Sequence, residues 1–205
     1  MENSESGRTE FREDQKHVFV VGFNKYATTT IHSYFETSGF PSIHWDSGHL
    51  ALKMVANLCA GKRVFEGYDS QYRIFSDMNF HGDRIQIEGN IYFRQMDSDY
   101  PGSSFIYNTR PLQKWLNSRM NHRGGSFLDG CKKLYNTHST DEVARIWTDQ
   151  RQTLEQWMFR YFRECERFLV VDIEGENPQG KIRDFIGNQL RLEQWQWFNK
   201  TCPLA

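Results

Sequence analysis

Short, largely apolar runs alternate along the chain with longer segments whose apolar residues recur every three or four positions. A short apolar run is typical of a strand buried on both faces at the centre of a parallel sheet. Five runs fit such a strand, at residues 17–22, 41–45, 72–76, 104–108 and 168–173. Because helical segments lie between them, the pattern predicts an α/β fold with a mostly parallel sheet flanked by helices.

The predicted helices begin and end at recognisable residues. The first ends at Gly39, and Pro111 is suited to the first turn of another, where its missing N–H is not needed. The helical segments are expected at residues 30–36, 48–60 and 82–100, from Pro111 onward, and at 141–163 and 180–190.

A polar loop joins the first predicted strand to the first predicted helix. In an open parallel sheet, ligands bind at the carboxyl ends of the strands, and the start of a helix favours an anion. This loop adds a lysine and three hydroxyl groups, and its candidate phosphate-binding residues are Asn24, Lys25, Tyr26, Ala27, Thr28, Thr29 and Thr30. The alternative is that the three threonines only cap the helix, since threonine is a common N-cap residue.

The loop differs from the phosphate loop of nucleotide kinases and ATPases. That loop reads G-x-x-x-x-G-K-[ST], with lysine directly before the Ser or Thr. Here Lys25 lies three residues before Thr28, and no Gly-Lys pair opens the helix. A kinase function therefore loses most of its support.

A second candidate anion site follows the fourth predicted strand. Arg110 lies at the end of that strand, and Ser118 follows about two helical turns later. An arginine can hold a phosphate through two parallel hydrogen bonds, and a serine adds a neutral donor. The alternative is a surface arginine paired with an acidic residue, but two anion sites at two strand ends favour a common ligand.

With these residues the sequence resembles the sulfotransferase family, and most closely its compact bacterial-type members. The family carries a loop G-x-x-K-x-G-T-T-[ST] after the first strand, which here reads GFNKYATTT over residues 22–30. Its arginine and serine for the 3′-phosphate match Arg110 and Ser118, and the likeness extends over residues 17–190. The resemblance implies a three-layer sandwich of the P-loop NTPase type, with 3′-phosphoadenosine-5′-phosphosulfate (PAPS) as co-substrate and no metal. Two departures are Ala27, where the family usually has glycine, and the lack of the late glycine-rich segment of many members.

The implied reaction moves a sulfonate group from PAPS to a hydroxyl or amine. The resemblance makes Lys25 the cation that stabilises the leaving phosphate oxygen. A base must take the proton of the acceptor, and Asp77 and His44, near strand ends, are the leading candidates, with Asp46 and His81 as rivals. The acceptor stays open among a small molecule, a lipid-linked oligosaccharide and a carbohydrate, and so does the oligomeric state.

Composition narrows the classes of partner. The 25 Lys and Arg nearly balance the 26 Asp and Glu, so no global field favours nucleic acid, and residues 119–123 are expected to form a solvated basic face. Four scattered cysteines without a CxxC pair indicate reduced thiols and a cytoplasmic location rather than zinc or disulfides. Residues 1–15 are expected to form a polar leader without signal-peptide character before one domain at 16–205, and no apolar run is long enough for a transmembrane helix.

Two other functions remain open. The first is a non-catalytic nucleotide-binding or interaction protein on the same fold, for which Ala27 is the warning sign. The second is a nucleotide kinase, which lacks an acidic strand end for magnesium apart from Asp172.

Overall fold

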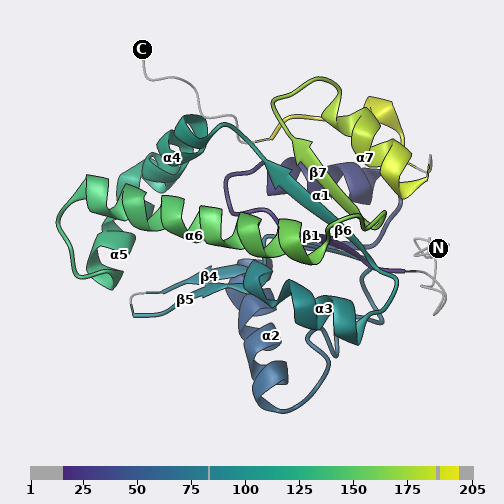
Figure 1. Ribbon diagram of the computed structural model, residues 1–205, viewed down its shortest axis with the longest axis horizontal. Coiled ribbons are helices and arrows are strands. Elements are labelled where there is room, and N and C mark those ends of the chain that lie inside the picture. Colours follow the sequence, from purple (N-terminus) through teal and green to yellow (C-terminus); the bar gives the residue numbers. More distant parts are fainter. Residues whose placement is uncertain (1–15, 83, 188–189, 199–205) are drawn as a thin grey trace, which may run out of the picture.

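A parallel sheet of five strands forms the centre of the computed structural model, which describes residues 16–82, 84–187 and 190–198 (Figure 1). The strand order is β2-β3-β1-β6-β7, and every neighbouring pair is parallel. The strands are β1 (Val18–Val20), β2 (Ser42–His44), β3 (Ile74–Ser76), β6 (Ser104–Thr109) and β7 (Phe168–Asp172). The five predicted strands are thus confirmed within a few residues, whereas the predicted leader lies outside the described residues.

Helices cover both faces of this sheet. Successive side chains of a strand point to opposite faces, and both faces are apolar, so both are buried under helices. Val18 and Val20 pack with α1 (Thr28–Thr37) and α7 (Pro178–Ile186) on one face. Phe19 and Val21 belong to a larger aromatic core on the other face. The helices of that second face are α2 (His49–Cys59), α3 (Phe93–Asp99), α4 (Leu112–Met120), α5 (Ser126–Leu134) and α6 (Thr140–Tyr161). The predicted α/β fold, a mostly parallel sheet between two layers of helices, is confirmed (Figure 1).

The segment predicted as a helix at residues 82–100 is largely something else. A hairpin of β4 (Asn79–His81) and β5 (Gln86–Glu88) comes first, then a 3₁₀ turn, and only then α3. In β5 the apolar Ile87 stands between the polar Gln86 and Glu88, an alternation that suits a strand and that is too short to stand out in the sequence. The hairpin lies beside α2 and brings polar side chains to the carboxyl end of the sheet.

The sheet order creates a crevice at the carboxyl end of β1. From β1 the chain first builds β2 and β3 on one side, then crosses to β6 and β7 on the other. Loops at such a reversal diverge and leave a ligand-binding crevice outside the strand ends. The predicted phosphate-binding loop, residues 22–30, lies there.

Two further findings concern membranes and thiols. Over the described ranges, no helix is both long and apolar enough to cross a membrane. Cys59, Cys131 and Cys165 are free thiols, and Cys202 lies outside the described residues.

Candidate active site

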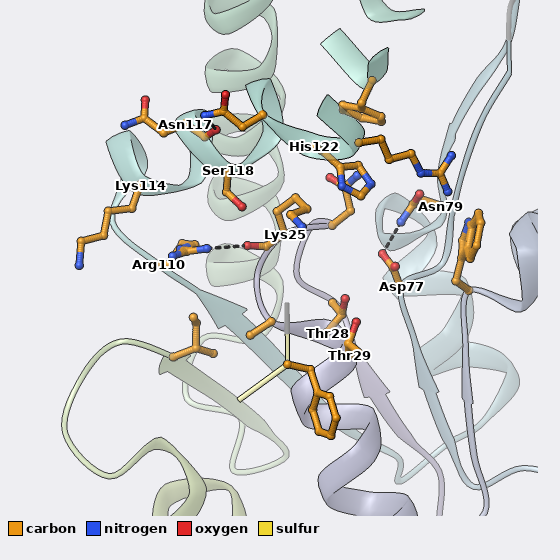
Figure 2. A pocket seen from close by; sticks show the side chains of 18 of the residues that line it. Lys25, Thr28, Thr29, Asp77, Asn79, Arg110, Lys114, Asn117, Ser118 and His122 are labelled. Atoms are coloured by element: carbon orange, nitrogen blue, oxygen red, sulfur yellow. Dashed lines mark hydrogen bonds between the residues drawn. The ribbon is translucent and has the colours of Figure 1, made fainter. Parts of the chain in front are cut away.

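One large cavity lies at the carboxyl end of the sheet and has a volume of about 1340 Å³ (Figure 2). It runs from the β6–α4 and β7–α7 connections, past the loop after β1, to the ends of β2 and β3 and the β4–β5 hairpin. The predicted site residues that line it are Asn24, Lys25, Ala27, Thr28, Thr29, His44, Asp77, Arg110 and Ser118.

The loop after β1 is held by hydrogen bonds from side chains to its carbonyl oxygens. Trp115 donates its indole N–H to the oxygen of Asn24 at 3.1 Å, and Arg110 Nη1 donates to that of Lys25 at 3.1 Å. Asn108 Nδ2 donates to the oxygen of Tyr26 at 2.5 Å. In a trans peptide the next N–H points opposite to the carbonyl, so these bonds fix the direction of the N–H groups of Lys25 and Ala27. Side chains of the protein itself therefore set the shape of this loop.

Ala27, which stands where the resemblance puts a glycine, adopts the left-handed conformation. Its φ is 57° and its ψ is 32°, and it forms the N-cap of α1 without a side-chain hydrogen bond. Left-handed backbone costs an L-residue roughly 1–2 kcal/mol because Cβ crowds the following carbonyl oxygen. The alternative in which the threonines cap the helix is wrong, since the helix begins at Thr28 and no side chain caps it.

Two residues of the predicted loop have side chains outside the cavity. Tyr26 is fully buried, with its ring centroid 5.3 Å from that of Trp115 and 6.4 Å from that of Tyr107. Thr30 is also fully buried, and its hydroxyl accepts the N–H of Phe198 at 3.1 Å. Their side chains fill the core beneath the loop instead of lining the cavity. Their assignment as phosphate-binding residues therefore stays a prediction that only their backbone atoms could meet.

Arg110 and Ser118 share one wall of the cavity with Lys114 and Asn117 (Figure 2). Arg110 follows β6, and the other three lie on one face of α4. Arg110 and Lys114 both form ion pairs with Glu174, which follows β7. Burial alone raises the pKa of Glu174, but hydrogen bonds from Lys114 and Arg110 bring it below its usual range. This wall thus holds two cations and one anion.

Asp77 and His44 meet on the opposite side of the loop. In the β2–β3 register His44 lies opposite Ser76, so Asp77 comes next to it, with His44 Nε2 3.3 Å from Asp77 Oδ2. Burial, assisted by the negative charge of Glu88, raises the pKa of Asp77 to about 6, and Asn79 Nδ2 donates to its other oxygen. Burial lowers the pKa of His44 to about 4, so this ring is neutral at pH 7.

The other candidate bases are less suitably placed. Asp46 is exposed, does not line the cavity, and accepts the hydroxyl of Tyr68 at 2.8 Å. His81 lines the cavity, but its Nε2 lies 3.2 Å from Glu88 Oε1.

Behind His81, Arg119 is fully buried, with its guanidinium 3.5 Å from Glu88 and 4.5 Å from the ring centroid of Trp147. The expectation of a solvated basic face is therefore wrong for Arg119, which compensates a buried carboxylate.

Lys25 lies between the two sides of the cavity (Figure 2). Burial lowers its pKa, the charge of Asp77 raises it, and that of Arg110 lowers it. Near it, His122 has a pKa lowered to about 4, first by burial and then by Lys25 and neighbouring arginines. The cavity therefore offers one cation in its middle, flanked by neutral histidines and a carboxyl group that titrates near pH 6.

The sequence of the chain matches a known protein family over most of its length. A family model described as a sulfotransferase domain matches residues 17–172. The chain belongs to the sulfotransferase family. The predicted resemblance is thus confirmed, and the matched residues include the loop after β1, Asp77, Arg110 and Ser118.

No curated protein matches this sulfotransferase. Among solved structures, a gluconokinase from Sinorhizobium meliloti 1021 aligns over 87% of this chain and 93% of its own, with 15% identity and a TM-score of 0.42.

Several residues that line the cavity of this sulfotransferase were not predicted from its sequence. Four more residues line the cavity: Lys114, Asn117, Asn121 and His122. Together with Ser118 they recur every three or four positions, as residues on one helix face do, and this spacing could have predicted them. Glu174 follows the end of β7, so the expectation that site residues follow strand ends, which selected Arg110, could have predicted it as well. Asn79 and Phe127 had no such signal, since the hairpin and α5 were not predicted.

Proposed function

We propose that this sulfotransferase moves a sulfonate group from PAPS to a hydroxyl or amine acceptor. The observation that carries the proposal is the single cavity shared by the loop after β1, the Arg110–Ser118 wall and the Asp77–His44 pair. Its volume of about 1340 Å³ exceeds the roughly 300–1,000 Å³ of ordinary small-molecule pockets. There is room for a nucleotide and an acceptor together.

The donor fits the two anion-binding regions of the cavity. The loop after β1 and the start of α1 suit the 5′-phosphosulfate, because oriented N–H groups and Lys25 favour a negative charge. Arg110, whose buried Nε has no hydrogen-bond partner among the residues that the structure describes, and Ser118 suit the 3′-phosphate. A nucleoside diphosphate without a 3′-phosphate leaves the second region without a ligand group.

The reaction then proceeds by in-line attack. The acceptor oxygen or nitrogen forms a bond to sulfur while the bond from sulfur to the phosphate oxygen breaks, and that oxygen leaves with the electron pair. Lys25 stabilises the charge that develops there, an effect larger in the transition state than in the ground state. Asp77 takes the acceptor proton, held in orientation by Asn79 and next to a neutral His44.

Calorimetric titration with 3′-phosphoadenosine-5′-phosphate (PAP), the desulfonated product, tests the donor assignment. We expect wild type to bind PAP and Arg110→Ala to bind it at least tenfold more weakly, about 1.4 kcal/mol. Lys25→Ala should weaken it as well. Arg145→Ala removes the same side chain from an exposed position on α6 and should bind like wild type. Failure of wild type to bind PAP, or equal affinity of Arg110→Ala, contradicts the proposal.

The left-handed Ala27 favours a second candidate, a non-catalytic nucleotide-binding or interaction protein on the same fold. An alanine where glycine is the usual residue brings a methyl group to the cavity wall and limits the approach of a phosphate. The two functions differ in one readout: PAP binding without transfer of labelled sulfonate from PAPS to any acceptor supports the second.

A further inference from the structure

A carboxylate stands at the wall where the proposed function puts the donor's 3′-phosphate. Glu174 Oε1 pairs with Arg110 Nη2, and Glu174 Oε2 pairs with Lys114 Nζ, so each oxygen meets a different cation. Both oxygens of a planar carboxylate are used, as a phosphate would use two of its oxygens. The arrangement places an internal anion on both side-chain cations of this wall.

The backbone around Glu174 fixes this position. The N–H of Glu174 donates to Asp172 Oδ1 at 3.0 Å, and the N–H of Gly175 donates to the Asp172 carbonyl at 3.1 Å. The resulting turn places Glu174, the second residue after β7, beside Arg110 at the end of β6, and Glu174 lines the cavity. Glu174 thus belongs to the cavity wall and not to the outer surface of the loop.

The two pairs differ in strength. The Arg110 and Glu174 side chains are 20% and 18% exposed, whereas the Lys114 side chain is 63% exposed. Solvent screening leaves little net value in an exposed pair, so the contact with Arg110 is the stronger one. Arg110 is also held from its other side, because its Nη1 donates to the carbonyl of Lys25. The guanidinium cannot move away with the carboxylate without losing that bond to the phosphate-binding loop.

Charge counting shows what a phosphate would meet. Arg110 and Lys114 contribute two positive charges and Glu174 one negative charge, which leaves a single net positive charge. A phosphate monoester carries about −1.5 to −2 at neutral pH. The phosphate must therefore displace the Glu174 carboxylate from Arg110, and it then binds close to that displaced negative charge. A ribose hydroxyl has no such conflict, since a carboxylate is a good acceptor for a ribose hydroxyl.

We propose that Glu174 is a specificity-determining residue that selectively weakens the hold of this site on a ligand's 3′-phosphate. The proposal rests on the proposed function, because it takes the 3′-phosphate to bind at Arg110. The donor and its desulfonated product share that phosphate, so Glu174 weakens the binding of both and limits inhibition by the product. Nucleotides without the 3′-phosphate are unaffected.

The test compares two nucleotides on three proteins. PAP and AMP, which differ by the 3′-phosphate, are titrated calorimetrically into wild type, Glu174→Gln and Glu176→Gln. Glu176 is an exposed carboxylate two residues further along the same loop, so its replacement removes the same charge without changing the Arg110 pair. We expect Glu174→Gln to bind PAP about tenfold more tightly than wild type, with AMP affinity changed less than twofold. Glu176→Gln should match wild type for both nucleotides.

The possible results separate this inference from the function it builds on. If folded Glu174→Gln binds PAP no more tightly than wild type, the role of Glu174 is overturned. The proposed function still holds in that case, provided that wild type binds PAP. Equal tightening of PAP and AMP also overturns it, because the effect is then a general one on anions. Absence of PAP binding by all three proteins contradicts the proposed function itself. Glu174→Ala is the second variant, with thermal unfolding to confirm its fold, and it should tighten PAP in the same direction.

Discussion

The two sides of the cavity are built in different ways. The side that we propose for the donor, called the donor side below, consists of one continuous loop, whose carbonyl oxygens are held by Trp115, Asn108 and Arg110, and of one face of α4. The opposite side takes His44 and Asp77 from two strand ends, Asn79 and His81 from a hairpin, and His122 from the turn after α4. The donor side relies on backbone geometry, whereas the opposite side relies on single side chains whose charges depend on burial.

This difference determines how each side responds to substitution. Three separate side chains hold the loop, so its N–H groups and the helix start are only partly affected when one of them is changed, and losses on the donor side should be graded. On the opposite side a buried carboxyl group, its amide partner and the Glu88–Arg119 pair behind it depend on one another. Single changes there should have the largest effects.

Asp77→Asn should give the largest loss of activity. The amide keeps the size of the side chain but cannot take a proton, so we expect the rate of sulfonate transfer to fall about 10²–10⁴-fold. PAP affinity should stay within about twofold, since we propose that the donor phosphates bind at the loop after β1 and at Arg110. Initial rates with labelled PAPS and PAP calorimetry check both points. Asp46→Asn, the same change at an exposed position outside the cavity, should keep wild-type activity, and a rate for Asp77→Asn within tenfold of wild type would contradict the assignment of the base.

Arg119→Met should give the largest loss of stability. The change takes the arginine away from the buried Glu88 and leaves His81 beside that carboxylate, so we expect a loss of up to about 3–5 kcal/mol, the cost of breaking a buried ion pair. Urea unfolding measures this loss as a lower midpoint. Arg145→Met, an exposed control on α6, should change the free energy of unfolding by less than about 0.5 kcal/mol. The double variant Glu88→Gln with Arg119→Met should lose less than Arg119→Met alone, and an additive loss would refute the pairing.

The same contrast explains which features the sequence could predict. The apolar run at residues 17–22 predicted a central strand because burial on both faces leaves a continuous apolar signal. The run at residues 168–173 also predicted a strand, but β7 lies at the edge of the sheet and its Val170 is exposed. Lys25 and Arg110 were found because strand ends converge at one edge of a parallel sheet. The β4–β5 hairpin was missed, since three residues of alternation do not stand out. Arg119 was misplaced because its burial depends on Glu88 and Trp147, which are distant in the chain. The roles of these residues in binding and catalysis stay predictions.

The pH dependence of activity should separate Asp77 from His44. Burial, then Glu88, raises the pKa of Asp77 to about 6, and the base works only when it has lost its proton. We therefore expect kcat/KM to rise about tenfold per pH unit below pH 6 and to level off above it. His44 and His122, with pKa values lowered to about 4, stay neutral through this range. Glu88→Gln removes the neighbouring negative charge and should move the rise to lower pH, whereas a midpoint near pH 4 in wild type would point to His44.

Ala27→Gly should give the smallest effect, a gain of about 0.5–1 kcal/mol in stability. Glycine adopts φ 57° without the crowding of Cβ, but it also gains freedom in the unfolded chain, so only part of the strain of roughly 1–2 kcal/mol is recovered. Urea unfolding measures this gain as a higher midpoint, with an unchanged slope of the free energy of unfolding against urea concentration. Ala56→Gly at an exposed position inside α2 is the matched control and should lose about 1 kcal/mol, because there the backbone is right-handed. If both variants lose stability, the methyl group of Ala27 contributes packing that outweighs its strain. The donor side would then depend on a side chain as much as the opposite side does.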